Sequence, residues 1–180
     1  MEITESIYVH KQNEWRNWLK KNHKKKKEIW LIYPNKASGK PRVAYHDAVD
    51  EAICFGWIDS TVKKFDHESA AQRFSPRNPK SSWSELNKER ARRLIKQKKM
   101  MKAGFALLPD ISDVELKIPA KMLKRLKADK ETWENFEKFP EVYKKLKTGW
   151  ITATEKNQIS EQRLNYFLKM TKKNKKYGWH

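Results

Sequence analysis

The chain has 180 residues, eight tryptophans and a formal net charge of +19 at pH 7. This length suits one domain with a small appended lobe, and the high aromatic content excludes a disordered basic tail. No stretch approaches the roughly 20 apolar residues of a membrane span, and the first residues do not resemble a secretory signal. The single cysteine excludes an intrachain disulfide and a cysteine-rich zinc site, so we expect a protein of the reducing cytoplasm.

Helical and strand patterns alternate in the first half of the chain. Residues 12–23 place Trp15 and Leu19 on one face of an amphipathic helix. A short apolar run at residues 28–33 is rich in β-formers and predicts a buried strand. A second helix is expected at residues 45–55, because Gly56 follows it as a stop signal.

A β-hairpin is expected next. Residues 57–65 and 70–75 alternate like strands, and a polar turn separates them. The pairing register is open by one residue, and it decides whether Asp59 faces Arg73.

The second half of the chain reads as helical. Ser82 and Glu85 match a capping box and predict a helix that runs to about Met101. The helices expected after it cover residues 119–128, 130–138, 140–148 and 154–170.

These elements predict an α+β fold, with a small β-sheet and flanking helices followed by a helical C-terminal lobe. We place an α+β domain at residues 1–105 and the helical lobe, with its basic tail, at residues 106–180.

Two arginines interrupt apolar helix faces. Arg90 falls within the apolar stripe of its predicted helix, and Arg163 does the same in the last helix. A buried guanidinium needs a partner, so for both arginines we expect an internal acid (Asp59, Asp47 or Glu51), a side chain that extends to water, or an anionic ligand.

Three sequence stretches carry a resemblance. They read EAICFGWIDS at 51–60, QRFSPR at 72–77 and SSWSELNKER at 81–90. The pattern resembles the bacterial YdeI/OmpD-associated family over about residues 10–105, and the C-terminal lobe is similar to it more loosely. The resemblance implies a bacterial protein linked to bacteriocin protection and tolerance of cationic antimicrobial peptides, with no agreed reaction or ligand.

The first functional hypothesis is a non-catalytic protein that binds a small anionic ligand. Arginines grip phosphate or carboxylate, a tryptophan wall excludes water, and Asn and Asp fix the orientation of the ligand. The candidate residues are Trp57, Asp59, Lys63, Arg73, Arg77, Trp83, Asn87 and Arg90.

The second hypothesis is an enzyme. Cys54 is the possible thiol nucleophile, with His46 or His23 as its base, and Asp59 with Lys63 is the possible acid–base pair. We expect no metal and no cofactor, because the histidines lack metal-ligand spacing and no glycine-rich phosphate loop is present.

The third hypothesis is nucleic-acid binding. Basic clusters at residues 24–27, 90–93 and 121–130 suit phosphates, but no recognition motif is present, so we expect this binding to be non-specific. The tryptophans that could stack bases are mostly expected in the core, namely residues 15, 18, 30, 57, 83 and 150.

Overall fold

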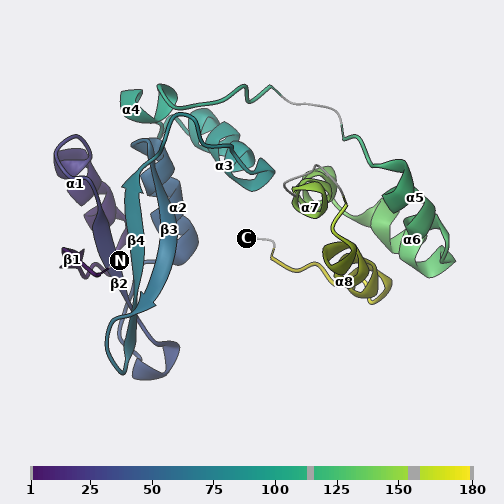
Figure 1. Cartoon of the computed structure of the whole chain (residues 1–180), viewed down its shortest axis with the longest axis horizontal. Coiled ribbons are helices and arrows are strands. Elements are labelled where there is room, and N and C mark those ends of the chain that lie inside the picture. Colours follow the sequence, from purple (N-terminus) through teal and green to yellow (C-terminus); the bar gives the residue numbers. More distant parts are fainter. Residues whose placement is uncertain (1, 113–115, 154–158, 179–180) are drawn as a thin grey trace. The chain divides into compact units, whose positions relative to one another are not determined.

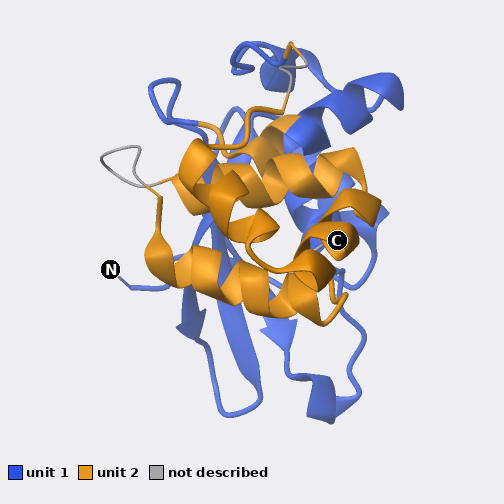
Figure 2. Cartoon of the chain, turned by 90° about the vertical axis from the view of Figure 1, so that its right-hand side faces the viewer, with its two compact units in different colours: residues 1–82, 89–111 blue, residues 83–88, 112–180 orange. Residues whose placement is uncertain are grey.

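The computed structural model describes residues 2–112, 116–153 and 159–178. The chain divides into two compact units, coloured separately in Figure 2. Unit 1 contains residues 1–82 and 89–111, and unit 2 contains residues 83–88 and 112–180. One β-sheet in the N-terminal half and helices mostly in the C-terminal half confirm the predicted α+β class (Figure 1). No described helix is long and apolar enough to cross a membrane.

Unit 1 is built on a four-stranded sheet with the order β1-β2-β4-β3. The short β1 pairs with β2 in parallel, and the other neighbours are antiparallel. The strands are β1 (Ser6–Ile7), β2 (Ile29–Pro34), β3 (Trp57–Lys64) and β4 (Ser69–Pro76).

The helices of unit 1 follow the predicted pattern closely in the first half of the chain. They are α1 (Gln12–Asn22), a 3-10 turn (Lys36–Ser38), α2 (Tyr45–Cys54), most of α3 (Glu85–Lys96) and α4 (Lys102–Phe105). The helix α3 begins at Glu85 rather than at Ser82, because Ser84 takes the capping position and its Oγ accepts a hydrogen bond from the Asn87 amide (3.3 Å).

Buried tryptophans fill much of the core of unit 1. The fully buried Trp15 contacts Phe74 of β4, and its indole donates to the Ala48 carbonyl of α2 (2.9 Å). This hydrogen bond ties α1 to α2 over the sheet. Trp30 and Trp57 are also fully buried, as predicted. Trp18 and Trp83 are only half-buried and Trp150 is 38% exposed, so the expectation of six core tryptophans is wrong for these three.

The hairpin register answers the question left open by the sequence. In β3 and β4, Asp59 lies opposite Phe74, while Ile58 lies opposite Ser75. Residues opposite each other in a ladder share a face. Asp59 therefore lies on the face of Phe74, and Arg73 lies on the other face.

The end of α2 meets α4 at unusually short range. A Cβ added to Gly104 would lie 2.5 Å from the Cys54 carbonyl oxygen, and one added to Gly56 would lie 2.7 Å from that of Ala103. The Met101 amide donates to the Cys54 carbonyl (3.0 Å). Gly56 also has φ +72°, which favours glycine, so both glycines are required for this packing.

In the described part of residues 112–180, four helices surround an apolar core. The helices are α5 (Ala120–Lys127), α6 (Lys130–Lys138), α7 (Glu141–Thr152) and α8 (Glu161–Lys172). The buried core residues are Met122, Leu126, Phe136, Phe139, Tyr143, Ile151, Leu164 and Phe167.

The last helix differs from its prediction. It begins at Glu161 after the Ser160 cap, and the predicted start at Thr154 lies outside the described residues. Its buried residues include Leu164 and Phe167, whereas Tyr166 is exposed.

Candidate functional site

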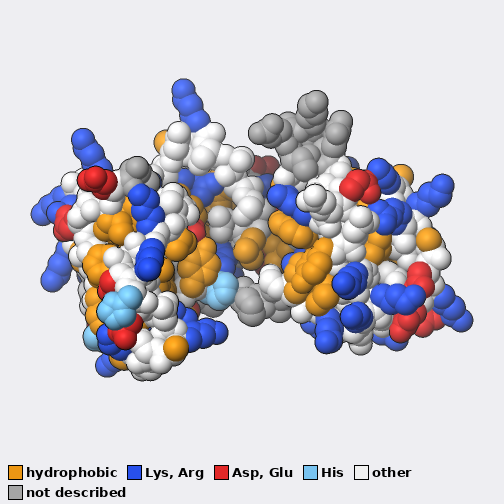
Figure 3. All heavy atoms as spheres, turned by 60° about the horizontal axis from the view of Figure 1, so that its bottom comes forward, with side chains coloured by type: hydrophobic (Ala, Val, Ile, Leu, Met, Phe, Trp, Pro, Cys, Tyr) orange, Lys and Arg blue, Asp and Glu red, His pale blue; other side chains and the backbone are white. Residues whose placement is uncertain are grey.

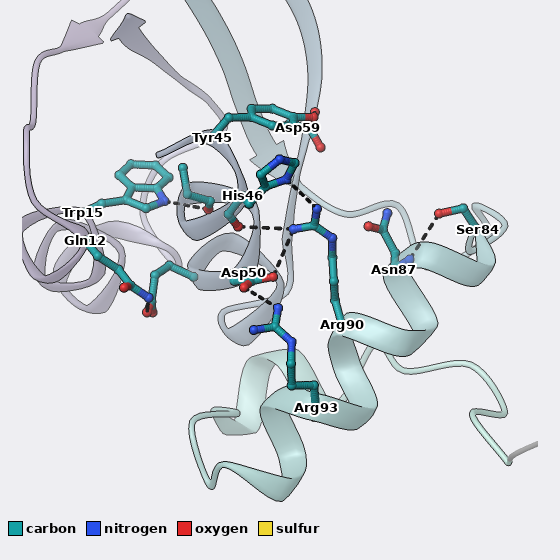
Figure 4. Close-up of polar contacts among 12 residues, drawn as sticks. Gln12, Trp15, Tyr45, His46, Asp50, Asp59, Ser84, Asn87, Arg90 and Arg93 are labelled. Carbon is teal, nitrogen blue, oxygen red and sulfur yellow. Dashed lines mark hydrogen bonds and ion pairs between the residues drawn. The ribbon is translucent and has the colours of Figure 1, made fainter. Parts of the chain in front are cut away.

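Arg90 lies in a buried ion pair within unit 1 (Figure 4). Its side chain is 5% exposed and donates to Asp50 Oδ1 (3.0 Å) and to the His46 carbonyl (3.2 Å). Arg93 donates to Asp50 Oδ2 (2.5 Å), so one carboxylate serves two guanidiniums. The expectation of a partner is right, but the acid is Asp50 and none of the three that the sequence suggested. The sequence pattern does not single out Asp50, which directly follows the buried Val49 in α2.

The same arginine orients a histidine. Arg90 Nη2 lies 2.9 Å from His46 Nδ1. Because a guanidinium can only donate, Nδ1 accepts, and the imidazole carries its proton on Nε2. The Arg90 side chain therefore has partners on both sides, and its charge is already matched by the protein.

Asp59 is engaged by a tyrosine at the start of α2 (Figure 4). Tyr45 Oη donates to Asp59 Oδ2 (2.6 Å), and the Tyr45 ring packs edge-on against His46. Burial, and then the neighbouring Asp59, raise the pKa of Tyr45, so its hydroxyl remains a donor. Lys63 is half-buried further along β3, beyond a register shift that follows Asp59.

Arg73 has its own partners on the opposite face of the hairpin. It donates to Glu28 (2.7 Å) and to the hydroxyls of Ser60 (3.2 Å) and Ser75 (3.3 Å). Hydrogen bonds from Thr4 and Arg73 lower the pKa of Glu28. The structure therefore does not bring Arg73 and Asp59 together.

Of the remaining candidate residues, Trp57 and Arg77 belong to unit 1 and make contacts that support its fold. Trp57 is part of the core, and its indole donates to the His23 carbonyl (3.1 Å). Arg77 is buried, donates to the Ser82 carbonyl, and has its pKa lowered by that burial. Trp83 and Asn87 belong to unit 2, where Trp83 lines a pocket described below.

Cys54 does not suit nucleophilic catalysis. Its side chain is fully buried. Burial, and then the charge of Glu51, raise the pKa of the thiol to about 11. A thiol with this pKa is almost entirely protonated at pH 7, so the alternative with Cys54 as nucleophile has no support from the geometry.

One cavity of unit 2 was not predicted from the sequence. Its volume is about 590 Å³, and it lies against one side of α7. We call it the Lys147 pocket; it is lined by Trp83, Ser84, Glu85, Leu86, Leu146, Lys147, Gly149, Trp150, Thr152, Ala153, Tyr177 and Gly178. All of these residues belong to unit 2.

Lys147 lies among aromatic rings in this pocket. Its side-chain nitrogen Nζ is 3.8 Å from the ring centroid of Tyr177, 5.3 Å from that of Tyr143 and 5.5 Å from that of Trp150. Tyr143 and Trp150 reach it because they are four residues before and three residues after it on α7. The rings give the ammonium a cation–π environment and remove most of its water.

The charge of Lys147 has no acidic counterpart in the described part of the chain. The residue is 7% exposed, and burial is the cause that lowers its pKa to about 8. Glu85 also lines the pocket, but its carboxylate is paired with Lys88 (2.9 Å). Among the described residues, Lys147 is therefore a buried charge whose surroundings in the pocket leave it without a counter-charge.

Arg163 supports one wall of the pocket. Its guanidinium donates to the carbonyls of Trp150 (2.6 Å) and Ala153 (3.1 Å) and lies 5.1 Å from the Trp150 ring centroid. Arg163 thus caps the C-terminal end of α7. Among the described residues, its guanidinium is partnered by backbone carbonyls and not by an internal acid.

The described residues include no cluster of three or more His, Cys, Asp or Glu side chains that could hold a metal ion.

Comparison with known families divides the chain in two. Residues 7–107 match a family described as a domain of unknown function, DUF8412. Residues 115–174 match the OmdA family, described as bacteriocin-protection, YdeI or OmpD-associated. The predicted YdeI/OmpD-associated relationship is confirmed, but it rests on the C-terminal part, whereas the N-terminal motifs fall in the other family. No curated protein and no solved structure matched the chain.

Proposed function

Because the chain belongs to the DUF8412 family through residues 7–107 and carries a YdeI/OmpD-associated domain at residues 115–174, we propose that it is a binding protein whose Lys147 pocket holds a small aromatic anion. The observation that carries the proposal is the buried ammonium of Lys147 inside an aromatic cavity, with no acidic partner among the described residues.

The physical argument concerns an unmatched charge. A buried cation without a counter-charge is costly, and the lowered pKa of Lys147 reflects that cost. A carboxylate bound beside Nζ restores the charge balance and recovers part of this free energy. Binding therefore gains most when the ligand is an anion.

The aromatic side chains that line the Lys147 pocket favour a ligand whose remaining part is apolar and flat. Trp83, Trp150 and Tyr177 present large apolar surfaces, and a volume of about 590 Å³ is in the range of small-molecule sites. Flat aromatic groups pack well on such walls. The arginines of unit 1 suit an anion less well, because Arg90 and Arg73 are already paired with Asp50 and Glu28.

We extend this proposal to the biological setting. The family name links OmdA domains to bacteriocin protection, and we propose a role in stress or antimicrobial-peptide tolerance through an intracellular anionic metabolite. A chain of net charge +19 repels cationic peptides, so direct capture of such a peptide is not the proposed route. A single free cysteine suits the reducing cytoplasm.

Calorimetry with three related compounds tests the site. 3-Phenyllactate carries both a ring and a carboxylate, lactate lacks the ring, and 2-phenylethanol lacks the carboxylate. We expect 3-phenyllactate to bind at least tenfold more tightly than either fragment. Lys147→Met should abolish the preference for the anion, whereas Lys147→Arg should keep it.

A matched control separates this site from the general basic surface. Lys138 is exposed on α6 and lies outside the pocket, so Lys138→Met removes one charge without touching the site. Equal losses of affinity in Lys147→Met and Lys138→Met, or no preference for 3-phenyllactate over lactate, would overturn the proposal.

A further inference from the structure

We propose that the ε-amine of Lys147 forms a reversible imine with an aromatic 2-oxo acid held in the Lys147 pocket. This inference rests on the proposed function, because the same pocket must first hold the acid. It adds a covalent chemistry and a ligand class to that site: an aromatic ring, a carboxylate and, next to the carboxylate, a ketone.

The arrangement of the pocket brings the reacting groups together. Lys147 lines a cavity large enough for such a compound, and the ring centroids of Trp150 and Tyr177 lie 5.5 and 3.8 Å from its Nζ. A carboxylate drawn to the ammonium places the adjacent ketone carbon close to the same nitrogen. Holding two reactants in this way replaces a bimolecular encounter with a local one.

The step balances without a further reactant. Lys147 first loses a proton to water, and the nitrogen lone pair then attacks the ketone carbon while the carbonyl π pair moves to oxygen. Protonation of that oxygen and loss of water leave a carbon–nitrogen double bond. The products are the imine and one water, and the protonated imine keeps a positive charge beside the carboxylate.

Tyr177 is the group to which we assign the proton transfer. Its ring is 3.8 Å from Lys147 Nζ at the centroid, and its buried hydroxyl has no hydrogen-bond partner in the described part of the chain. Burial raises the pKa of this hydroxyl, so it is a donor at neutral pH. It can supply a proton to the departing hydroxyl group.

Lys147 differs from the other lysines in nucleophilicity. With a pKa of about 8, about half of its amines are neutral at pH 8. An ordinary lysine with a pKa near 10.4 is neutral in roughly one molecule in 250 at that pH. The contrast matters here because the chain contains 32 lysines.

Borohydride trapping tests the inference. The full chain is incubated with 3-phenylpyruvate at pH 8, reduced with sodium borohydride, and analysed by intact mass and peptide mapping. We expect one reduced adduct, at Lys147, in preference to every other lysine. It should be absent in Lys147→Arg, unchanged in Lys138→Arg and formed several-fold more slowly in Tyr177→Phe.

The outcomes separate this inference from the proposed function. 3-Phenyllactate has the ring and the carboxylate but no ketone, so it reports binding alone. If wild type and Lys147→Arg bind it while adducts spread over the surface lysines, the imine is overturned and the binding site stands. If 3-phenyllactate does not bind the wild type and no adduct forms at Lys147, both the imine and the proposed binding function are overturned.

Discussion

Buried charges are handled in opposite ways in the two units. In unit 1, Asp50 is shared by Arg90 and Arg93, and His46 completes the contacts of Arg90. In unit 2, Lys147 is surrounded by rings and has no acidic partner among the described residues. The first arrangement stabilises the fold, and the second leaves a charge available to a ligand.

The Asp50 ion pairs give a matched stability test. Arg90 is 5% exposed, so Arg90→Met leaves a buried carboxylate short of a partner and should lower the free energy of unfolding by about 3 kcal/mol. The Arg93 side chain is 49% exposed, so Arg93→Ala should cost less than about 1 kcal/mol. Urea denaturation measures both.

A double mutant completes this test. Arg90→Met combined with Asp50→Leu removes both buried charges, and we expect it to be more stable than Arg90→Met alone. Equal effects of Arg90→Met and Arg93→Ala would contradict the assignment of Arg90 as the buried member.

Lys147 makes the free energy of unfolding depend on pH, and the direction follows from its lowered pKa. Its pKa is about 8 in the folded protein and near 10.4 in an unfolded chain, so between these values the unfolded state binds more protons. The free energy of unfolding should therefore rise with pH across this window, by up to about 3 kcal/mol from this group. Denaturation at pH 7, 8.5 and 10, with Lys147→Met subtracting the other titrations, measures it. If the free energy of unfolding changes with pH equally in wild type and in Lys147→Met, the lowered pKa of Lys147 is refuted.

At the scale of elements, strong local sequence patterns were sufficient to predict where several helices and strands begin and end. The helices α1 and α2 and the strands β2, β3 and β4 lie within one or two residues of their predicted bounds, because apolar periodicity and turn residues agree there. The start of α3 was misplaced because Ser82 and Ser84 are both good caps. Only packing decides between them, and packing is a tertiary effect.

The Lys147 pocket could not be predicted from local sequence patterns. One lysine among 32 carries no distinguishing local signal, and the tryptophans at 83 and 150 were both expected in the core. The spacing of Tyr143, Lys147 and Trp150 on one helix face was the available clue. The position of Tyr177 beside Lys147 depends on the path of the chain after α8.

The N-terminus of α6 provides a test at this scale. Asp129 Oδ1 accepts from the Thr132 amide (2.8 Å), and Oδ2 pairs with Lys172 of α8 (2.8 Å). Hydrogen bonds from Lys172 and then Thr132 lower the pKa of Asp129 to about 2. Its stabilising contribution is therefore present above its ordinary pKa and is lost as the pH falls toward 2.

Two variants of Asp129 separate the cap from the ion pair. Asp129→Asn keeps a capping oxygen but loses the charge, whereas Asp129→Ala loses both. At pH 7 we expect the melting temperature to decrease in the order wild type, Asp129→Asn, Asp129→Ala. The gap between wild type and Asp129→Asn should close near pH 2. A gap that stays constant with pH would contradict the ion-pair role.

At the scale of the whole molecule, the charge of +19 is spread rather than concentrated on the face in view. Figure 3 shows Lys and Arg side chains over both units, with acidic side chains between them. Several local ion pairs, such as Lys121 with Glu161 and Lys40 with Glu68, use part of this charge. Such a surface favours weak, non-specific attraction to nucleic acid.

Salt dependence separates this attraction from pocket binding. Affinity for a DNA duplex should fall by roughly a thousandfold or more between 50 and 200 mM salt, because several counterions are released together. Binding of 3-phenyllactate involves a single charge in a buried site and should change far less. Fluorescence anisotropy and calorimetry measure the two. DNA binding that persists at 200 mM salt would instead support a dedicated nucleic-acid site.

The close approach of α2 and α4 has a practical consequence. Gly104 lies directly over the carbonyl of Cys54, the one cysteine in the chain, whose sulfur is fully buried. A thiol reagent can reach this sulfur only when that part of unit 1 opens, so the rate of labelling under native conditions reports the opening free energy of the region. The chain thus carries a single natural reporter of local unfolding, and it lies in unit 1.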